Sequence, residues 1–220
     1  MTPVELPAFL AGLDESWAGL SLTMPLKQAV LPLLASASEL AEQVAAANTV
    51  LLPARHGENT DVAGMVAALA EAEITSVSRA VVLGGGATAR SALAALAILG
   101  CRAPTLVVRS EPTETLAAAR RLDVEPLVTG WDPAVLEATD LVISTVPAGA
   151  ADGFAPYVAD VPVLLDVVYD PWPTALALSC RGTVVGGASM LLHQAAAQVA
   201  LMTGLKPPLE AMRAALKQSG

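Results

Sequence analysis

The sequence predicts an α/β protein in which a doubly wound parallel sheet follows a smaller α/β lobe. From Arg79 onward, short apolar runs alternate with helical segments at the spacing of βαβ units. One of these runs, residues 81–83, leads through three glycines directly into a helical segment. Hydrophobic residues make up 54% of the 220 residues and charged residues 15%, so the chain has enough apolar surface for a folded core and is not disordered.

The larger lobe is expected to span residues 79–186. Its predicted strands cover residues 80–83, 105–108, 124–128, 141–144, 163–167 and 183–185, and its predicted helices cover residues 88–99 and 115–122. The strands are short and rich in β-branched or other apolar residues, which is typical of parallel strands that are buried on both faces.

The smaller lobe is expected to span residues 1–75. We predict a strand at 18–23, helical turns over 27–47 with a break at Pro32, a strand at 48–52, a polar loop at 53–59 and a helix at 62–72. Thr60 or Asp61 is placed as the N-cap of that last helix. Helices at 189–203 and 208–217 close the chain, and the segment 188–220 is expected to return to the first lobe.

Charge and composition exclude several classes of function. Twelve Lys and Arg against 21 Asp and Glu give a net charge of −9, so nucleic acid is not an expected partner. The longest uncharged stretch, residues 182–205, is interrupted by glycines and amides, and no membrane span is expected. The N-terminus shows no basic region before an apolar run, so the expected location is cytoplasmic. Cys101 and Cys180 are expected to be reduced, and no metal site is expected.

A glycine turn joins the first strand of the larger lobe to its first helix. Gly84, Gly85, Gly86 and Ala87 form this turn, and Ala89 stands at the close-packing position of a GxGxxA pattern. Gly84 permits the tight turn, and Gly86 lets backbone N–H groups approach a pyrophosphate at the helix N-terminus. The pattern predicts a dinucleotide site. The alternative is a glycine-rich connection between a strand and a helix that binds no ligand.

The next strand ends in a residue that bears on the choice of dinucleotide. Arg109 stands where a protein specific for NAD usually offers a carboxylate to the ribose hydroxyls. A guanidinium pairs with a 2′-phosphate in bidentate geometry, so Arg109 favours NADP. Glu111 argues in the opposite direction, and the alternative for Arg109 is a solvated strand end.

Three polar clusters lie at strand ends of the first lobe. They contain Thr23 with Lys27, then Asn48, and then Asp61. In a parallel α/β lobe such ends meet at one edge of the sheet, where they can bind a polyhydroxylated ligand. Reduction of a ketone needs a proton for the developing alkoxide, which Lys27 can supply while Asp61 positions it. Taken singly, each residue has a structural explanation as a solvated lysine, a turn residue or an N-cap.

Six motifs in order resemble the shikimate dehydrogenase family over almost the whole chain. They begin at Gly19, Ala46, Glu58, Leu83, Asp166 and Gly187, and read GLSLTMPLK, AANT, ENTDVAG, LGGGATAR, DVVYDPWPT and GASMLLHQAA. The resemblance implies NADPH-dependent reduction of 3-dehydroshikimate to shikimate in aromatic amino-acid biosynthesis. The expected partner is the small-molecule substrate, and the chain is expected to be a monomer or a homodimer.

The resemblance also implies the roles of individual residues. Lys27 and Asp61 fall on the catalytic pair of the family. The positions that bind the substrate are Thr23, Asn48, Tyr169 and Gln194, and those beside the nicotinamide are Val167 and Gly187.

The sequence departs from the family pattern at its N-terminus. The family begins with a strand, a Ser-x-Ser loop that binds the substrate carboxylate, a helix and a second strand, whereas residues 1–10 of this chain already resemble the following helix. Three hypotheses follow: a shikimate dehydrogenase, a catalytically weak or inactive NADP-binding fragment or paralogue, and a quinate/shikimate dehydrogenase.

Overall fold

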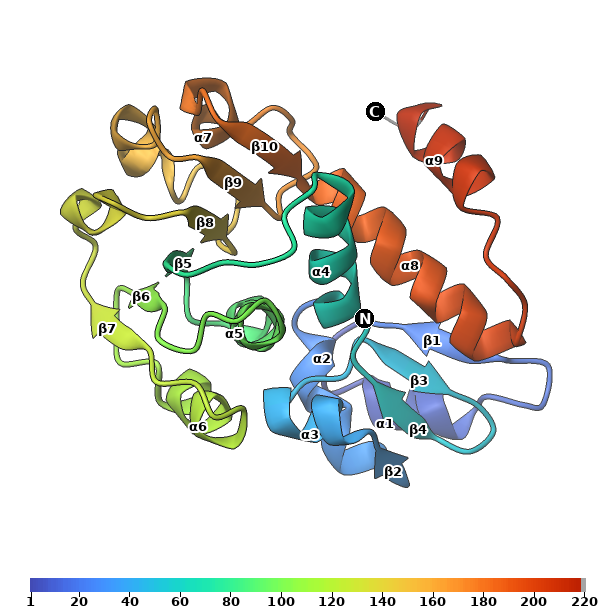
Figure 1. Cartoon of the computed structure of the whole chain (residues 1–220). Helices are drawn as coiled ribbons and strands as arrows, with labels where there is room; N and C mark the ends of the chain where they lie inside the picture. The colour runs from blue at the N-terminus through green and yellow to red at the C-terminus, as the bar shows by residue number, and fades with distance from the viewer. Residues whose placement is uncertain (219–220) are drawn as a thin grey trace.

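A computed structural model of the chain describes residues 1–218 and contains two sheets. Figure 1 shows the larger sheet on the left and the smaller sheet on the right, with helices α4 (Asp61–Glu71) and α8 (Gly187–Thr203) between them. These two helices pack against each other along their length. They connect the two sheets, since α4 leads out of the smaller sheet and α8 leads out of the larger one.

The larger sheet has six parallel strands in the order β10-β9-β8-β5-β6-β7, which confirms the predicted doubly wound fold. Its strands are β5 (Ala80–Leu83), β6 (Thr105–Val107), β7 (Leu127–Thr129), β8 (Leu141–Ser144), β9 (Val163–Asp166) and β10 (Thr183–Gly186). The connections contain α5 (Ala87–Ile98), α6 (Thr113–Arg121), α7 (Ala175–Ser179) and the 3₁₀ turns η2 (Pro133–Leu136) and η3 (Asp152–Tyr157).

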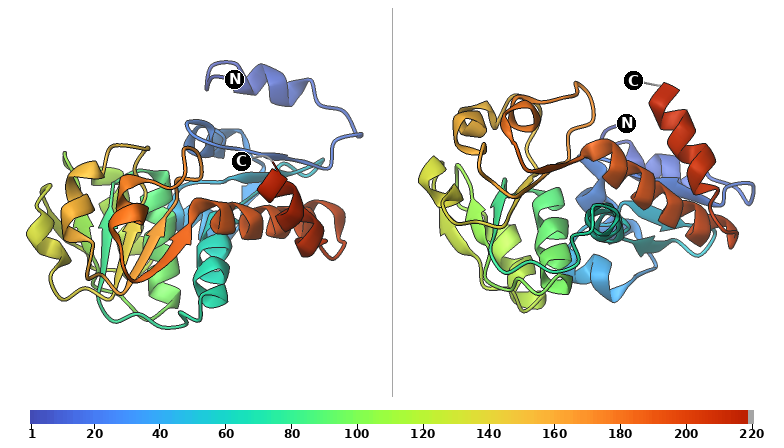
Figure 2. Two further views of the ribbon diagram at one scale, coloured as in Figure 1. Left: turned by 90° about the horizontal axis from the view of Figure 1, so that it is seen from above. Right: turned by 45° about the horizontal axis from the view of Figure 1, so that its top comes forward.

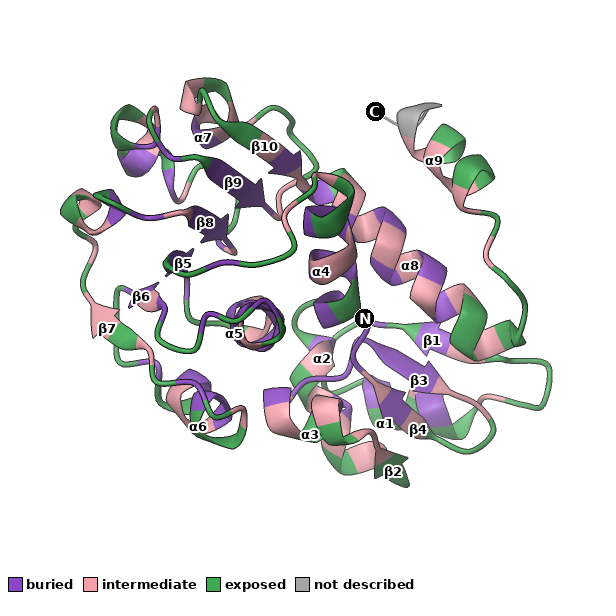
Figure 3. Cartoon of the chain, viewed as in Figure 1, coloured by how far each residue is buried: buried purple, intermediate pink, exposed green. Residues whose placement is uncertain are grey.

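Successive residues of the central strands enter two different apolar clusters. Val82 and Ile143 pack in the cluster that contains helix α5, whereas Val81 and Val142 pack in the cluster that contains Phe154. Figure 3 shows that β8 and β9 are buried over most of their length. Burial on both faces explains why these strands are continuous apolar runs rather than alternating ones.

The smaller sheet has the order β1-β3-β4-β2 and is mainly antiparallel, which corrects the expectation of a parallel first lobe. Strand β3 (Thr49–Leu51) pairs antiparallel with both β1 (Gly19–Ser21) and β4 (His56–Glu58). Strand β4 occupies part of the segment that was expected to be a polar loop. Helix α1 (Leu6–Ala11) lies over this sheet, as Figure 2 shows. Its residues Leu6 and Leu10 are buried in the apolar cluster of the sheet.

The prediction of helical turns throughout residues 27–47 is wrong. This segment contains α2 (Leu26–Ala29), the 3₁₀ turn η1 (Leu31–Leu33), strand β2 (Ser36–Ala37) and α3 (Glu39–Val44). Pro32 has no amide hydrogen for helix continuation, and β2 instead pairs parallel with β4. Ser38 then starts α3, because its side-chain oxygen accepts a hydrogen bond from the Ala41 N–H at 3.3 Å.

Other boundaries differ by a few residues. Strand β7 begins at Leu127 rather than at residue 124, and α4 begins at Asp61 rather than at residue 62. Thr60 occupies the N-cap position of α4, but its side chain makes no capping hydrogen bond. Helix α9 (Leu209–Gln218) ends the described part of the chain, in which no helix is both long and apolar enough to cross a membrane.

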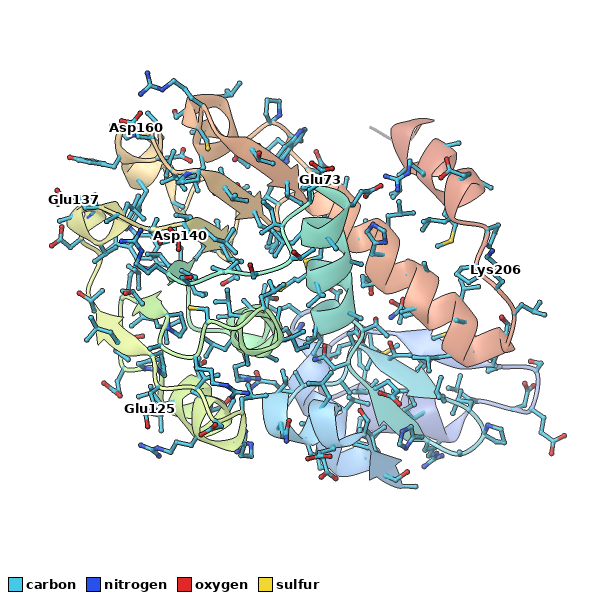
Figure 4. All side chains as sticks on the ribbon, in the orientation of Figure 1. Glu73, Glu125, Glu137, Asp140, Asp160 and Lys206 are labelled. Carbon is cyan, nitrogen blue, oxygen red and sulfur yellow. The ribbon has the colours of Figure 1, made fainter. Side chains whose placement is uncertain are left out.

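Charged side chains lie mainly at the periphery of the molecule. In Figure 4 the labelled carboxylates of Glu125, Glu137 and Asp160 point outward from the larger sheet. Among the charged residues in the described part of the chain, the buried ones are Asp61, Arg90 and Asp166.

Candidate active site

A cleft of about 890 Å³ lies at the carboxyl ends of the strands of the larger sheet. The residues after β5, β6, β8 and β9 line one side of it, and residues around the start of α2 line the other. Ligands of doubly wound sheets bind outside the carboxyl ends of the strands, so the cleft occupies the expected place. Nine of the thirteen sequence-predicted site residues line it: Thr23, Lys27, Gly84, Gly85, Gly86, Ala87, Arg109, Val167 and Tyr169.

The glycines of the turn between β5 and α5 have different surroundings. Gly84 has φ +112°, and a methyl group built on it would lie 2.6 Å from the Thr145 hydroxyl oxygen. Gly86 precedes α5, and a methyl group built there would meet nothing within 4 Å. The N-terminus of α5 therefore faces open space in the cleft, where its free N–H groups can bind an anion.

Arg109 lies at the end of the cleft that is lined by residues following β6 and β7. Its guanidinium carbon lies 5.8 Å from the centroid of the Trp131 ring, and both residues line the cleft. The two are brought together because β6 and β7 are parallel neighbours, and the Val108 N–H continues the pairing with the Thr129 carbonyl at 3.1 Å. Trp131 was not predicted as a site residue.

Lys27 and Asp61 form an ion pair between the start of α2 and the start of α4. Lys27 Nζ lies 2.6 Å from Asp61 Oδ2, and the side chains are 14% and 4% exposed. The Lys27 carbonyl accepts a hydrogen bond from the Ala47 N–H at 2.8 Å, which fixes α2 beside β3. The pair is therefore nearly desolvated, with Lys27 reaching the cleft and Asp61 behind it.

Asn48 organises the carboxylate side of this pair. Its amide nitrogen lies 3.0 Å from Asp61 Oδ1, 2.8 Å from Thr60 Oγ1 and 3.0 Å from Gln194 Oε1. The Asn48 side-chain oxygen accepts a hydrogen bond from the Thr60 N–H at 2.8 Å, and Gln198 donates to the Asn48 main-chain carbonyl at 3.1 Å. Both oxygens of Asp61 are thus engaged, one by Lys27 and one by Asn48, so the carboxylate is held in one orientation.

Antiparallel pairing explains why these polar residues converge even though the first lobe is not parallel. Ser21 at the end of β1 lies opposite Thr49 at the start of β3, and Glu58 at the end of β4 lies opposite Thr49 on the other side. One end of the smaller sheet therefore brings together the residues that follow β1, those that precede β3 and those that follow β4.

The four remaining predicted residues lie behind the residues that line the cleft. Asn48, Asp61 and Gln194 are buried and are not among the residues that line the cleft, whereas Tyr169 lines it with 58% of its surface exposed. Gly187 also lies behind the wall, where a methyl group would come within 2.2 Å of the Val167 carbonyl oxygen.

Asp166 holds the segment that carries Val167 and Tyr169. Its carboxylate accepts hydrogen bonds from the Thr174 hydroxyl at 2.7 Å and from the Val168 N–H at 3.2 Å. Burial raises the pKa of Asp166, and the bonds from Thr174 and Val168 offset part of that rise. These bonds tie both ends of residues 167–173 to the end of β9.

The fold and the cleft define an α/β protein of the dinucleotide-binding class, with a lysine–carboxylate pair facing the glycine turn. Residues 1–50 match the family model of the shikimate dehydrogenase substrate binding domain, and residues 187–217 match that of the shikimate 5'-dehydrogenase C-terminal domain. The chain is 33% identical over 240 residues to the shikimate dehydrogenase (NADP(+)) of Synechocystis sp.. The aligned region covers 98% of this chain and 82% of that protein.

Two solved structures extend the comparison. The shikimate dehydrogenase of Mycobacterium tuberculosis is 37% identical with a TM-score of 0.90, over 99% of this chain and 85% of that one. The quinate dehydrogenase of Corynebacterium glutamicum in complex with NAD is 30% identical with a TM-score of 0.84, over 98% and 83%. The chain belongs to the shikimate dehydrogenase family, which confirms the resemblance seen in its sequence motifs.

Proposed function

We propose that this chain interconverts 3-dehydroshikimate and shikimate with NADP as its cofactor. Family membership supports this reaction, since the Synechocystis relative is a shikimate dehydrogenase (NADP(+)). The observation that carries the proposal is the Lys27–Asp61 pair, whose 2.6 Å contact lies at the cleft that also contains the glycine turn. A proton donor and a dinucleotide-type turn therefore share one cavity.

The residues around the glycine turn fit a bound NADP. The open space at Gly86 and the free N–H groups of α5 suit the pyrophosphate, and the Arg109 guanidinium suits the 2′-phosphate. Val167 lines the cleft as the apolar wall for the nicotinamide, and Gly187 lets that wall pack closely. When bound, NADPH supplies the hydride for the carbonyl carbon of the substrate.

Lys27 serves as the proton donor in the reduction and as the acceptor in the oxidation. As the carbonyl oxygen gains negative charge, the ammonium group donates its proton to that oxygen, and in the reverse direction the amine takes the proton from the hydroxyl. Asp61 orients the ammonium group through their 2.6 Å contact. Asn48 holds the other oxygen of Asp61, so the carboxylate cannot rotate away from Lys27.

Polar groups on both sides of the cleft are available to bind the substrate. The hydroxyls of Thr23 and Tyr169 line the cleft, and the Asn48–Gln194 network adjoins it from behind Lys27. We assign substrate binding to residues 1–75 with the C-terminal helices of 188–220, and cofactor binding to residues 79–186. Residues 219–220 of that assignment lie outside the described residues.

A second candidate substrate is quinate, which carries one more ring hydroxyl. The similarity to the quinate dehydrogenase of Corynebacterium glutamicum favours this candidate. The third hypothesis, an NADP-binding chain without catalysis, differs from both in a measurable way, because it predicts cofactor binding without turnover.

The test is reduction of NADP⁺ by the purified chain with shikimate or with quinate as substrate. The absorbance of the reduced nicotinamide measures the rate. We expect turnover with shikimate, and we expect Lys27→Ala to lower it about 10²-fold or more with calorimetric NADP affinity nearly unchanged. Binding of NADP without turnover of either substrate would contradict the proposed enzyme. Faster turnover of quinate would change the assigned substrate to quinate and leave the proposed roles of Lys27 and Asp61 unchanged.

A further inference from the structure

Arg109 meets an aromatic ring at the end of the cleft where a 2′-phosphate would bind. Its side chain is exposed and follows β6, and its guanidinium carbon lies 5.8 Å from the centroid of the Trp131 ring. A guanidinium within about 6 Å of an indole centroid is attracted to the negative face of the ring. The contact restricts a side chain that would otherwise sample many rotamers in solvent.

The Trp131 ring is itself held in place. Phe154, which is fully buried in η3, packs edge-to-face against it with the centroids 4.8 Å apart and the ring planes at 88°. Edge-to-face aromatic pairs of this kind have a defined geometry. A rigid contact therefore runs from the apolar core through Trp131 to Arg109.

The charges along the cleft make the placement of Arg109 important. Two of the described residues that line it are cationic, Lys27 and Arg109, and Lys27 is already paired with Asp61 at 2.6 Å. Glu111, two residues after Arg109, also lines the cleft and would repel a phosphate dianion. A guanidinium that was free to swing toward Glu111 would lose much of its attraction for such a group.

We propose that Trp131 is a positioning residue for cofactor choice: its ring holds the Arg109 guanidinium so that the chain prefers a dinucleotide with a 2′-phosphate. The inference rests on the proposed function, because it names a determinant of NADP over NAD in the same cleft. The Trp131 ring contacts Arg109 and Phe154, so we expect it to act on binding of the phosphate and not on the proton transfer.

The direct test is calorimetric titration of the whole chain with adenosine 2′,5′-bisphosphate and with 5′-AMP, which differ only in the 2′-phosphate. We expect Trp131→Leu to weaken binding of the bisphosphate about threefold and to leave 5′-AMP unchanged, since an exposed cation–π contact has about this strength. Trp131→Phe retains an aromatic face and is the matched control, with affinities close to those of the unaltered chain.

A double-mutant cycle separates positioning from general support of the fold. In the Arg109→Ala background, Trp131→Leu is expected to cause no further change in the ratio of the two affinities, because the group that Trp131 positions is gone. An equal loss for both ligands with Trp131→Leu, or additive losses in the cycle, would overturn the inference.

The indole N–H resonance of the folded, unaltered chain provides a second test that does not depend on the stability of Trp131→Leu. The indole N–H resonance of Trp131, assigned by its absence in Trp131→Phe, is expected to shift on addition of the bisphosphate but not in Arg109→Ala. No shift in the unaltered chain would overturn the positioning role. Failure of the proposed function is a separate result: a chain that prefers the bisphosphate over 5′-AMP but turns over neither shikimate nor quinate would contradict the proposed reaction and leave the positioning role of Trp131 intact.

Discussion

Gly64 in α4 lies directly against Gln194 in α8, and a methyl group built on Gly64 would come within 2.8 Å of Gln194 Cβ and 2.9 Å of the Met190 carbonyl oxygen. The close approach of the two helices lets Gln194 Oε1 reach the Asn48 amide at 3.0 Å. Because the Asn48 amide also lies 3.0 Å from Asp61 Oδ1, the spacing of the two helices affects the position of the Lys27–Asp61 pair.

Replacement of Gly64 by alanine should push α8 away from α4. We expect the free energy of unfolding in Gly64→Ala to fall by about 1–3 kcal/mol, as for other overpacked sites, and KM for shikimate to rise because Gln194 moves. Denaturant unfolding and steady-state kinetics measure the two effects. Gly153→Ala is the matched control, since a methyl group there meets nothing within 4 Å, and equal effects of the two substitutions would contradict the packing argument.

Asp61→Asn tests the charge of the pair with almost no change of shape. The asparagine oxygen can still accept the hydrogen bond from Asn48, but its amide group cannot balance the Lys27 ammonium. We expect kcat to fall about 10²-fold while affinity for adenosine 2′,5′-bisphosphate stays the same. Glu137→Gln, at the periphery, is the control for loss of one negative charge, and unchanged kcat in Asp61→Asn would remove Asp61 from the mechanism.

The larger sheet could be predicted from the sequence because its physical cause is local. Strands β5, β8 and β9 are covered on both faces, so each is a short apolar run between helical segments. Strands β2 and β4 leave no such signal. Ser36–Ala37 and His56–Glu58 are strands because their backbones pair with each other, and in β4 also with β3, which is a tertiary effect.

The site was predictable to the extent that it depends on residue type. Lys27, Asn48 and Asp61 stand in polar motifs at strand ends, and the structure joins them through 2.6 Å and 3.0 Å contacts. Trp131 was missed because it is a lone aromatic residue in a loop. The signal that could have found it is positional, since Arg109 and Trp131 each follow a strand by two residues and those strands are neighbours.

Arg90 joins the two halves of the molecule and its loss should destabilise the fold. It is 1% exposed, and its guanidinium donates to the carbonyls of Val44 at 2.6 Å and Ala45 at 3.0 Å, at the C-terminus of α3. Burial lowers the pKa of Arg90, and Glu114 partly restores it. Arg90→Met leaves two carbonyls without donors, so we expect the free energy of unfolding to fall by about 2–4 kcal/mol.

Denaturant unfolding measures the effect of Arg90→Met, and Arg102→Met provides the comparison. Arg102 also donates to carbonyls at a helix C-terminus, those of Leu122 at 3.2 Å and Asp123 at 2.9 Å, but its side chain is exposed. Water can replace its hydrogen bonds, so we expect a loss below about 1 kcal/mol. Similar losses for the two variants would show that burial of Arg90 is not what makes it important.

Asp166 should make stability depend on pH in the direction opposite to an ordinary surface carboxylate. Burial raises its pKa in the folded state, so the folded chain binds the proton more tightly than the unfolded chain, whose aspartates titrate near about 3.9. The contribution of Asp166 to the free energy of unfolding is therefore fully present below about pH 3.9, and it is lost as the pH rises through the higher pKa of the folded state. Asp166→Asn removes this titration but keeps one oxygen for the Val168 N–H and an amide that can donate to Thr174.

We expect the difference in unfolding free energy between Asp166→Asn and the unaltered chain to grow in favour of the variant across that window and then to level off, as measured by urea unfolding at a series of pH values. Asp140→Asn is the control with the opposite sign, because hydrogen bonds from Arg79 lower the pKa of Asp140 and its contribution is lost as the pH falls. A flat difference for Asp166→Asn would mean that the hydrogen bonds from Thr174 and Val168 balance the effect of burial, so that the pKa of Asp166 is the same in the folded and the unfolded chain.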